Sequence, residues 1–441
     1  MIKKLLILAG IAVAICFVIG SIDAPPPDVS AFTRTTTEPA DEDNAYCGFV
    51  AATNAVRRMP GAVQWEKLSP EETDAIVDEN AEALALFQNA MRRAKWYDKA
   101  ARNAGGLYLP PMSDFTKMMK LYKAKVGRQI VRGEIASAVE GVQDFLLLNR
   151  TMQGDAESIV CWLLADGLRG MGMHLAVQIV VSGKASDAEL RKLLETFLLT
   201  DSSMLRKNIL LAVDNDFVYY FEKAQRIVDS NMRCTGLRNM RCTGLRRIKA
   251  GFEYHPNRTR ALYVKMIGKV KELLSNDYDK GALQSFEDEI KSETPGRFGC
   301  LAPNFVGWRL LAALFPAWKD LAERLACSEF YLSASEVVVA AELYRRKTGR
   351  HPESLAALVP EFLPSVPTDP FDHGAALKYD VERGIVWTVG PDRDFTGDIQ
   401  SGKKSYGRNR KYVVNLDGSE ARYMGREMIP LSNSLNPVNP V

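Results

Sequence analysis

The chain has 441 residues, of which 46% are apolar and 25% are charged, and 57 basic against 54 acidic residues give a formal net charge of +3. This length and composition fit a globular protein with one large or two moderate hydrophobic cores. The near-balance of charge excludes the strongly basic surface typical of nucleic-acid-binding proteins, so we expect no nucleic-acid partner.

A targeting segment opens the chain. Two lysines precede an uncharged, mostly apolar run over residues 5–22, and the proline-rich stretch that follows begins at Asp23. The run is close to the roughly 20 residues that a membrane-spanning helix needs, but it also resembles a long signal peptide with a cleavage site before Ser21. Residues 1–22 are therefore either a signal anchor or a cleaved signal peptide.

The charge around this leader predicts its orientation. Lysines before the apolar run and aspartates after it keep the N-terminus in the cytoplasm. We expect contact with the inner membrane through residues 5–22, as a single-pass protein with its body in the periplasm, or secretion to the periplasm after cleavage. A lipoprotein is not expected, because Ile15 precedes Cys16 where a lipoprotein needs a small residue.

A mostly α-helical body follows the leader. A linker rich in proline, threonine and aspartate covers residues 23–43, and helical periodicity then continues over residues 44–327. Helices are expected at residues 113–132, 135–149, 156–181, 204–228, 259–274 and 305–327. Numerous helices with short polar connections predict a body of stacked antiparallel helices.

Capping boxes mark two further helix starts. Ser69 stands three residues before Glu72, and Ser186 stands three residues before Glu189. In this pattern the serine and the glutamate each satisfy a free backbone N–H group of the first turn. The first box predicts a helix that continues to Phe87.

A short unit, NMRCTGLR, occurs twice in tandem and contains Cys234 and Cys242. Eight residues are too few for a structural repeat, so an exposed loop is the simplest interpretation. The two cysteines are our candidates for a disulfide in an oxidising compartment, since a lone pair lacks the further ligands that zinc requires. Cys161 and Cys327 lie in apolar helical surroundings and are expected to be core thiols.

The sequence contains no constellation that catalysis requires. His174, His255, His351 and His373 do not fall at metal-ligand spacing, and no nucleophile elbow or phosphate-binding glycine loop is present. Cys47 superficially resembles a cysteine-peptidase nucleophile, but the flanking pattern of that family is missing. We therefore expect that the protein is not an enzyme, with an unrecognised hydrolase that uses Cys47 or His174 as an alternative.

Residues 335–398 show a distinctive order of elements. An apolar helix ends in a basic turn followed by Gly349, which suits a left-handed C-cap. A short helical turn then directs Leu355 and Leu358 inward, and four prolines keep residues 361–371 free of helix.

Two hairpins are expected after these prolines. The first pairs residues 377–381 with 385–389 through a loop in which Gly384 takes a positive φ. The second pairs residues 412–416 with 420–424 around an Asp-Gly turn and adds strands to the same antiparallel sheet.

This order resembles the C-terminal domain of the type II secretion major pseudopilin. The matching segments are Tyr344 to Pro352, Leu355 to Leu358, Leu363-Pro364 with Thr368-Asp369-Pro370, Leu377 to Val389 and Gly390-Pro391-Asp392. The resemblance implies a small α+β pseudopilin-like domain, which we place at residues 328–426, followed by a disordered tail at residues 427–441. The same order of elements is also similar to the tails of large exported proteins of planctomycete- and verrucomicrobia-like bacteria. That second similarity implies no activity.

An acidic loop after the first hairpin is the candidate metal site. Asp392, Asp394 and Asp398 can converge on a hard cation, with Gly397 permitting a sharp turn. Major pseudopilins bind calcium in the corresponding loop, so the resemblance implies calcium as a cofactor here. The alternative is a solvated acidic turn.

These features favour a membrane-anchored or exported envelope protein with a non-catalytic binding or scaffolding role toward a protein partner in the envelope. An accessory component of type II secretion or pilus-like assembly is the alternative that the resemblance supplies. Incorporation into a fibre is not expected, because residues 1–22 lack the Gly-Phe junction and the acidic residue of a pseudopilin leader.

Overall fold

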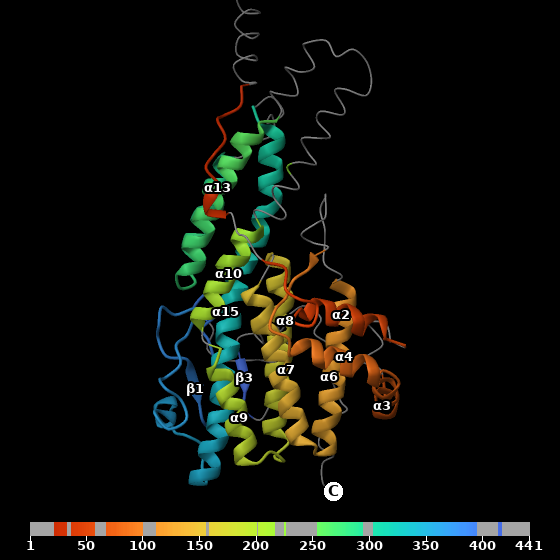
Figure 1. Cartoon of the computed structure of the whole chain (residues 1–441). Coiled ribbons are helices and arrows are strands. Elements are labelled where there is room, and N and C mark those ends of the chain that lie inside the picture. The colour runs from red at the N-terminus through yellow and green to blue at the C-terminus, as the bar shows by residue number, and fades with distance from the viewer. Residues whose placement is uncertain are drawn as a thin grey trace, which may run out of the picture. The chain divides into compact units, whose positions relative to one another are not determined.

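The computed structural model describes residues 22–32, 37–57, 68–99, 112–155, 158–200, 202–216, 225, 254–293, 303–394 and 413–416. The chain divides into two compact units (Figure 1). Unit 1 comprises Met1–Thr35, Asn103–Tyr108 and Val213–Ala322, and unit 2 comprises Thr36–Arg102, Leu109–Ala212 and Glu323–Val441. The division falls within α10 (Ser202–Asp216) and α15 (Phe305–Thr348).

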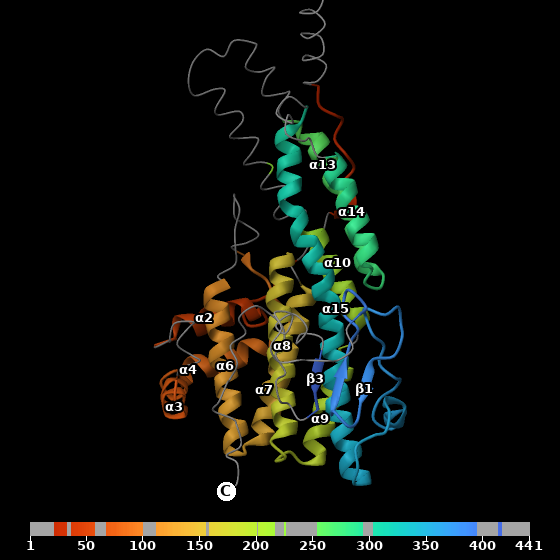
Figure 2. The same cartoon turned by 180° about the vertical axis from the view of Figure 1, so that it is seen from behind.

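Unit 2 is built mainly of helices, and the prediction of a mostly α protein with a small antiparallel sheet is confirmed. Its helices besides parts of α10 and α15 are α2 (Ala45–Asn54), α3 (Pro70–Glu79), α4 (Ala81–Met91), α6 (Met112–Arg132), α7 (Ile135–Gly154), α8 (Ile159–Val181) and α9 (Asp187–Leu198). Helices α6, α7 and α8 lie side by side in both views (Figure 2). Gly141 allows the closest approach between α6 and α7, because a Cβ there would collide with Val126.

Aromatic rings fill the part of this core between α2, α4, α6 and α7. Phe49 lies 5.1 Å from Phe115 between ring centroids, and Phe87 lies 5.8 Å from Tyr122. Tyr122 in turn lies 5.2 Å from Phe145, with the rings nearly perpendicular. Edge-to-face geometry of this kind adds to the stabilisation that burial of the rings provides.

Both predicted capping boxes are confirmed. Ser69 Oγ accepts a hydrogen bond from the backbone N–H of Glu72 at 3.2 Å, and the Glu72 carboxylate accepts one from the N–H of Ser69 at 2.8 Å. The Ser186 box at the start of α9 has the same reciprocal bonds. The predicted helix from Ser69 to Phe87 was wrong in its length, because it breaks at Asn80.

The break has a local cause. Asn80 is buried, and its Nδ2 donates to the carbonyl of Ile76 at 2.8 Å while its Oδ1 accepts from the N–H of Arg57 at 2.9 Å. An asparagine side chain that bonds to nearby backbone competes with the helical ladder. The chain therefore turns at Asn80 and restarts as α4.

The C-terminal segment of unit 2 forms a three-stranded antiparallel sheet in the order β1-β2-β3. The strands are β1 (Lys378–Asp380), β2 (Ile385–Trp387) and β3 (Val413–Asn415), each shorter than predicted. The positive φ values predicted at Gly349 and Gly384 are confirmed at +78° and +59°. The second strand of the other predicted hairpin, residues 420–424, lies outside the described residues.

A buried carboxylate connects the proline-rich crossing to this sheet. Residues 361–371 contain no helix, as predicted, and this crossing contains Asp369, which is 1% exposed. The Asp369 carboxylate accepts hydrogen bonds from the N–H groups of Phe371 and Val389, each at 2.9 Å, and from Thr388 Oγ1 at 2.5 Å. The short helix η5 (Leu355–Leu358) precedes the crossing, and both of its leucines are buried as predicted.

Helix α15 corrects one prediction. A helix was expected to end at residue 327, but α15 runs continuously from Phe305 to Thr348. Within this stretch Ser335 is satisfied inside the fold, since its Oγ donates to the carbonyl of Tyr331 at 2.8 Å. The domain boundary predicted between residues 327 and 328 falls within this helix and stays a prediction.

Unit 1 contains α13 (Pro256–Ser275), α14 (Lys280–Glu293), the first part of α15 and the short helix η1 (Ser30–Phe32). In both views the segment after residue 22 runs beside α13 (Figures 1 and 2). Among the described residues, no helix combines the length and the apolar content needed to cross a bilayer. Residues 1–21, which make up most of the predicted leader, lie outside the residues that the structure describes.

Candidate functional site

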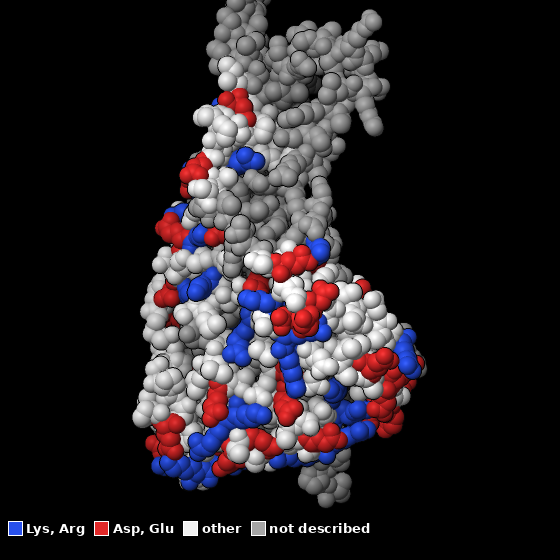
Figure 3. Space-filling view, viewed as in Figure 1, with Lys and Arg blue, Asp and Glu red and all other residues white. Residues whose placement is uncertain are grey.

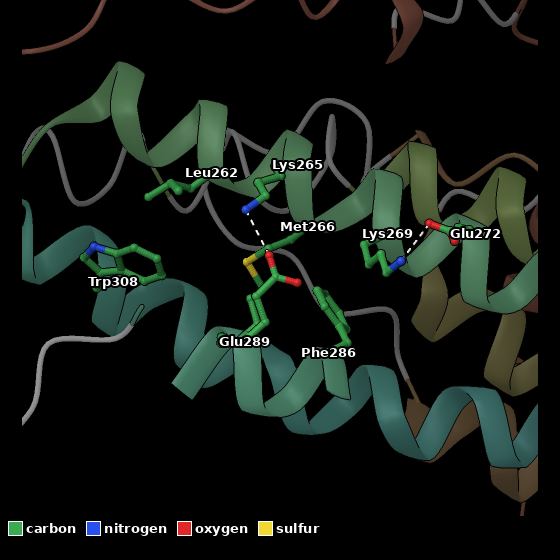
Figure 4. Close-up of a pocket in the computed structure, with 9 residues that line it drawn as sticks. Leu262, Lys265, Met266, Lys269, Glu272, Phe286, Glu289 and Trp308 are labelled. Atoms are coloured by element: carbon green, nitrogen blue, oxygen red, sulfur yellow. Dashed lines mark hydrogen bonds and ion pairs between the residues drawn. The ribbon is translucent and has the colours of Figure 1, made fainter. Parts of the chain in front are cut away.

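The candidate site is an apolar groove in unit 1 with a volume of about 170 Å³ (Figure 4). Two pairs of apolar residues at i, i+4 spacing line it, Leu262 with Met266 on α13 and Phe286 with Ile290 on α14. Trp308, near the start of α15, closes one end. Residues at this spacing share one helix face, so each helix contributes a continuous apolar strip.

Charged side chains form the rim of the groove. Lys265 Nζ of α13 reaches Glu289 Oε1 of α14 at 3.0 Å, and Lys269 Nζ reaches Glu272 Oε2 at 2.9 Å (Figure 4). Both pairs are exposed, with the Lys265 side chain 61% and the Glu289 side chain 43% accessible. Exposed pairs are worth about 0–1 kcal/mol each, so a charged ligand can displace either carboxylate at little cost.

A residue near the N-terminus of the chain, Asp23, caps the start of α13. His255 is the N-cap residue and makes no side-chain cap, and Pro256 occupies the first turn. Instead, the Asp23 carboxylate accepts hydrogen bonds from the N–H groups of Asn257 at 2.8 Å and Arg258 at 3.0 Å. Asn257 Nδ2 also donates to the carbonyl of Ala24 at 2.9 Å. A carboxylate at this place satisfies free N–H groups and complements the helix dipole.

A buried polar contact joins the start of α13 to the start of α15. Asn304, just before α15, adopts a positive φ of 61° and is fully buried. Its Oδ1 accepts from the N–H of His255 at 2.8 Å and from Thr259 Oγ1 at 2.9 Å. A Cβ at Gly307 would collide with Thr259 and Asn304, so α13 and the start of α15 pack at the distance that glycine permits.

Unit 2 contains a separate buried cluster centred on Asp144, which is 3% exposed. Its carboxylate accepts from Arg92 Nε at 2.6 Å, Gln88 Nε2 at 2.8 Å and Tyr122 Oη at 2.7 Å. Burial, together with the Asp144 charge, raises the pKa of Tyr122 well above its usual value, and the hydrogen bond with Asp144 raises the pKa of Arg92. A carboxylate that is saturated by donors fixes α4, α6 and α7 together and has no lone pair directed at a substrate.

A second cluster in unit 2 joins α8 to α15. Asp166 Oδ1 accepts from Ser328 Oγ at 2.7 Å and also pairs with Arg169, and Asp166 Oδ2 accepts from Arg324 Nε at 3.1 Å. Burial lowers the pKa of Arg169 despite the nearby Asp166. These bonds explain why α15 continues through Ser328, since a buried hydroxyl group is stable where it has a partner.

Charges on the surface are mixed in sign. On the face shown in Figure 3, basic and acidic side chains alternate over unit 2. The ion pairs of unit 2 include Arg128 with Asp78 and Arg132 with Asp74, each at 2.6 Å. Such exposed pairs stabilise the fold only weakly.

The sequence-predicted metal and disulfide residues are only partly described. Asp392 and Asp394 flank Arg393, whose φ is +58° and whose Nε donates to the carbonyl of Phe371 at 2.9 Å. Asp398, Cys234 and Cys242 lie outside the described residues. Within the described ranges, no three His, Cys, Asp or Glu side chains gather as metal ligands. The calcium site and the disulfide therefore stay predictions.

The cysteines in the described part of the chain carry free thiols. Cys161 and Cys327 are buried in α8 and α15, which confirms the prediction of core thiols. Cys47 Sγ accepts from Asn44 Nδ2 at 3.3 Å and donates to Asp41 Oδ1 at 3.5 Å. Burial, together with Asp41, raises the pKa of the Cys47 thiol, which disfavours the thiolate that a nucleophile needs.

Sequence reasoning missed the groove and the Asp23 cap. The apolar strips of α13 and α14 were visible as i, i+4 pairs, but the same pattern describes a helix face that is covered by its own core. The start of α13 carried a clearer signal. Neither His255 nor Pro256 has a side chain suited to capping, so the free N–H groups of the first turn require a hydrogen-bond acceptor from elsewhere in the chain.

Comparison of this chain with protein-family models, with curated proteins and with solved structures finds no match.

Proposed function

We propose that this chain is a non-catalytic protein of the bacterial envelope, held at or exported across the cytoplasmic membrane by its N-terminal apolar run. Its binding surface is the groove between α13 and α14. The observation that carries the proposal is that α13 bears two features at once: the Asp23 cap at its N-terminus and the groove along its side.

The cap matters because of where Asp23 stands in the sequence. The apolar run ends at residue 22, and the next residue is built into unit 1 through two backbone hydrogen bonds. A leader followed by a long unattached linker would leave the body free to diffuse on its tether. Attachment at Asp23 instead supports a body that is coupled directly to the membrane segment.

The groove supports binding rather than catalysis. Its lining is apolar, and its rim carries lysines and carboxylates that pair with one another. An apolar concavity with a few polar groups is the usual form of a ligand or partner site. Two buried, well-bonded carboxylates, Asp144 and Asp166, lie in unit 2 and act as structural anchors.

The same proposal covers the N-terminal apolar run and the C-terminal sheet. Residues 5–22 form the membrane helix or the signal peptide, and the C-terminal sheet with its proline-rich crossing is a pseudopilin-like module. The contacts of Asp369, from the Thr-Asp-Pro segment, support this module because they join the crossing to the two residues that follow β2. They also favour the second candidate, an accessory role in type II secretion or pilus-like assembly.

The test is the location of the full chain in a Gram-negative host. Alkaline phosphatase folds only outside the cytoplasm, so we join it after Val441 and assay activity in intact cells. We expect an active fusion that either resists carbonate extraction from membranes or is released with the periplasm. An inactive fusion in the cytoplasmic fraction would overturn the proposal.

A further inference from the structure

We propose that the groove between α13 and α14 holds one hydrocarbon chain of an anionic phospholipid, with the lipid phosphate bound by Lys265 and Lys269. This inference rests on the proposed function, since it takes the lipid from the membrane to which the leader attaches the protein.

The size of the groove fits a segment of an acyl chain. Its volume is about 170 Å³. An engineered apolar cavity of about 150 Å³ in another protein binds benzene, so this groove has room for about six carbon atoms. Met266 and Phe286, each buried at its base, offer the flexible and flat apolar surfaces that a methylene chain contacts well.

The charge on the rim fits an anionic headgroup. Lys265 and Lys269 stand one helical turn apart on α13, on the rim of the groove. Their present partners, Glu289 and Glu272, are 43% and 61% accessible and are held by exposed ion pairs. A phosphate that bridges both lysines replaces two weak pairs by one charge-assisted contact and releases both glutamates to water.

The position of the groove along α13 brings it close to a bilayer. Asp23, one residue after the apolar run, is bonded to the N–H groups of Asn257 and Arg258 at the start of the helix. At a rise of about 1.5 Å per residue, Lys265 lies about 10 Å along α13 from Arg258. Ile22, the last residue of the apolar run and the neighbour of Asp23, is 62% exposed. The phospholipid of the same membrane is therefore the amphiphile nearest to the groove.

The experiment uses the full chain in nanodiscs and reads the fluorescence of Trp308, taken as the difference between the wild type and Trp308→Phe. The probes are phosphatidylglycerol with brominated acyl chains and phosphatidylcholine with the same chains, since bromine quenches tryptophan on contact. We expect at least twofold stronger quenching of Trp308 by the anionic lipid than by the neutral lipid.

Two variants separate a groove site from simple nearness to the membrane. Lys265→Gln combined with Lys269→Gln is expected to remove the preference for the anionic lipid, and Ile290→Phe is expected to reduce quenching by both lipids. The matched control is Lys291→Gln, an exposed residue of α14 that pairs with Glu287 outside the groove lining and should behave as the wild type. Equal quenching by both lipids, or a preference that the double variant keeps, would overturn the lipid site.

Carbonate extraction of membranes from cells that express the same full chain keeps this test distinct from that of the proposed function. Protein that resists extraction but shows no selective quenching of Trp308 retains the membrane attachment and rejects only the lipid site. Protein that shows no selective quenching, and whose alkaline phosphatase fusion is inactive in the cytoplasmic fraction, rejects both.

Discussion

The carboxylate of Asp23 caps a helix whose second residue, Asn257, lies 234 positions later in the chain, with an oxygen to nitrogen distance of 2.8 Å. Asp23 follows the N-terminal apolar run directly, so this bond joins the leader region to the helix that carries the groove. The same carboxylate also accepts from Arg258, and it thereby satisfies two N–H groups that the helix itself cannot satisfy.

Replacement of Asp23 by alanine tests the energetic weight of this cap. We expect Asp23→Ala to lower the free energy of unfolding by about 1 kcal/mol, the usual cost of removing a helix cap. The measurement is urea denaturation of the full chain. The matched control is Asp28→Ala, because Asp28 is exposed and accepts a local bond from the N–H of Ser30 at 2.9 Å. Equal stability of the two variants would contradict the account of the cap.

The Asp144 cluster predicts a larger effect. Asp144→Ala leaves the buried hydroxyl of Tyr122 without its partner, so we expect a loss of about 1–3 kcal/mol in urea denaturation. Arg92 adds less to this loss, because its side chain is 47% accessible and keeps Glu140 at 3.7 Å. Asp114→Ala serves as the control, because Asp114 pairs only at the surface with Lys117 and should cost less than about 1 kcal/mol. A loss below about 1 kcal/mol for Asp144→Ala would show that the cluster does not clamp the helices.

Glu336 on α15 predicts a pH dependence of stability. Burial raises the pKa of Glu336 to about 7 from the ordinary value of 4.5. Between these values the folded protein keeps a proton that the unfolded chain has lost, so the free energy of unfolding falls as pH rises from about 4.5 to about 7.

Replacement of Glu336 by glutamine should remove this dependence, because the side chain can no longer ionise. At pH 8 we expect Glu336→Gln to be more stable than the wild type, by at most about 3 kcal/mol. The check is denaturation at a series of pH values, with Glu353→Gln as control, since the Glu353 side chain is 75% accessible. If both variants follow the wild-type curve, Glu336 does not titrate as stated.

The acidic loop after the first hairpin predicts calcium binding. We expect calcium to raise the melting temperature of the full chain, and a chelator to reverse the rise, because a ligand that binds only the folded state stabilises it. Asp392→Asn combined with Asp394→Asn should abolish the response. A wild-type melting temperature that neither calcium nor chelator changes would reject the site.

Local sequence signals predicted the elements that depend on near neighbours. The Ser69 capping box needs only Glu72 three residues later, and the helix end at Gly349 needs only a residue that tolerates a positive φ. Each of these features is decided within one or two turns of chain, so composition and spacing contain the required information.

Features that depend on distant partners were not predictable in this way. The helix expected at residues 305–327 in fact continues, because Asp166, 162 positions before Ser328, accepts the Ser328 hydroxyl inside the fold. The groove likewise requires the apolar faces of α13, α14 and the start of α15 to remain partly uncovered, and periodicity cannot distinguish an uncovered face from a buried one.

The central claim is that α13 is joined directly to the end of the N-terminal apolar run, and amide hydrogen exchange at Asn257 and Arg258 tests it most directly. These two N–H groups lie in the first turn, where no carbonyl of the helix can reach them. We predict slow exchange in the full-length wild type and fast exchange in Asp23→Ala, while amides in the middle of α13 keep their protection. Fast exchange at both positions in the wild type, or equal protection in the variant, would contradict the claim.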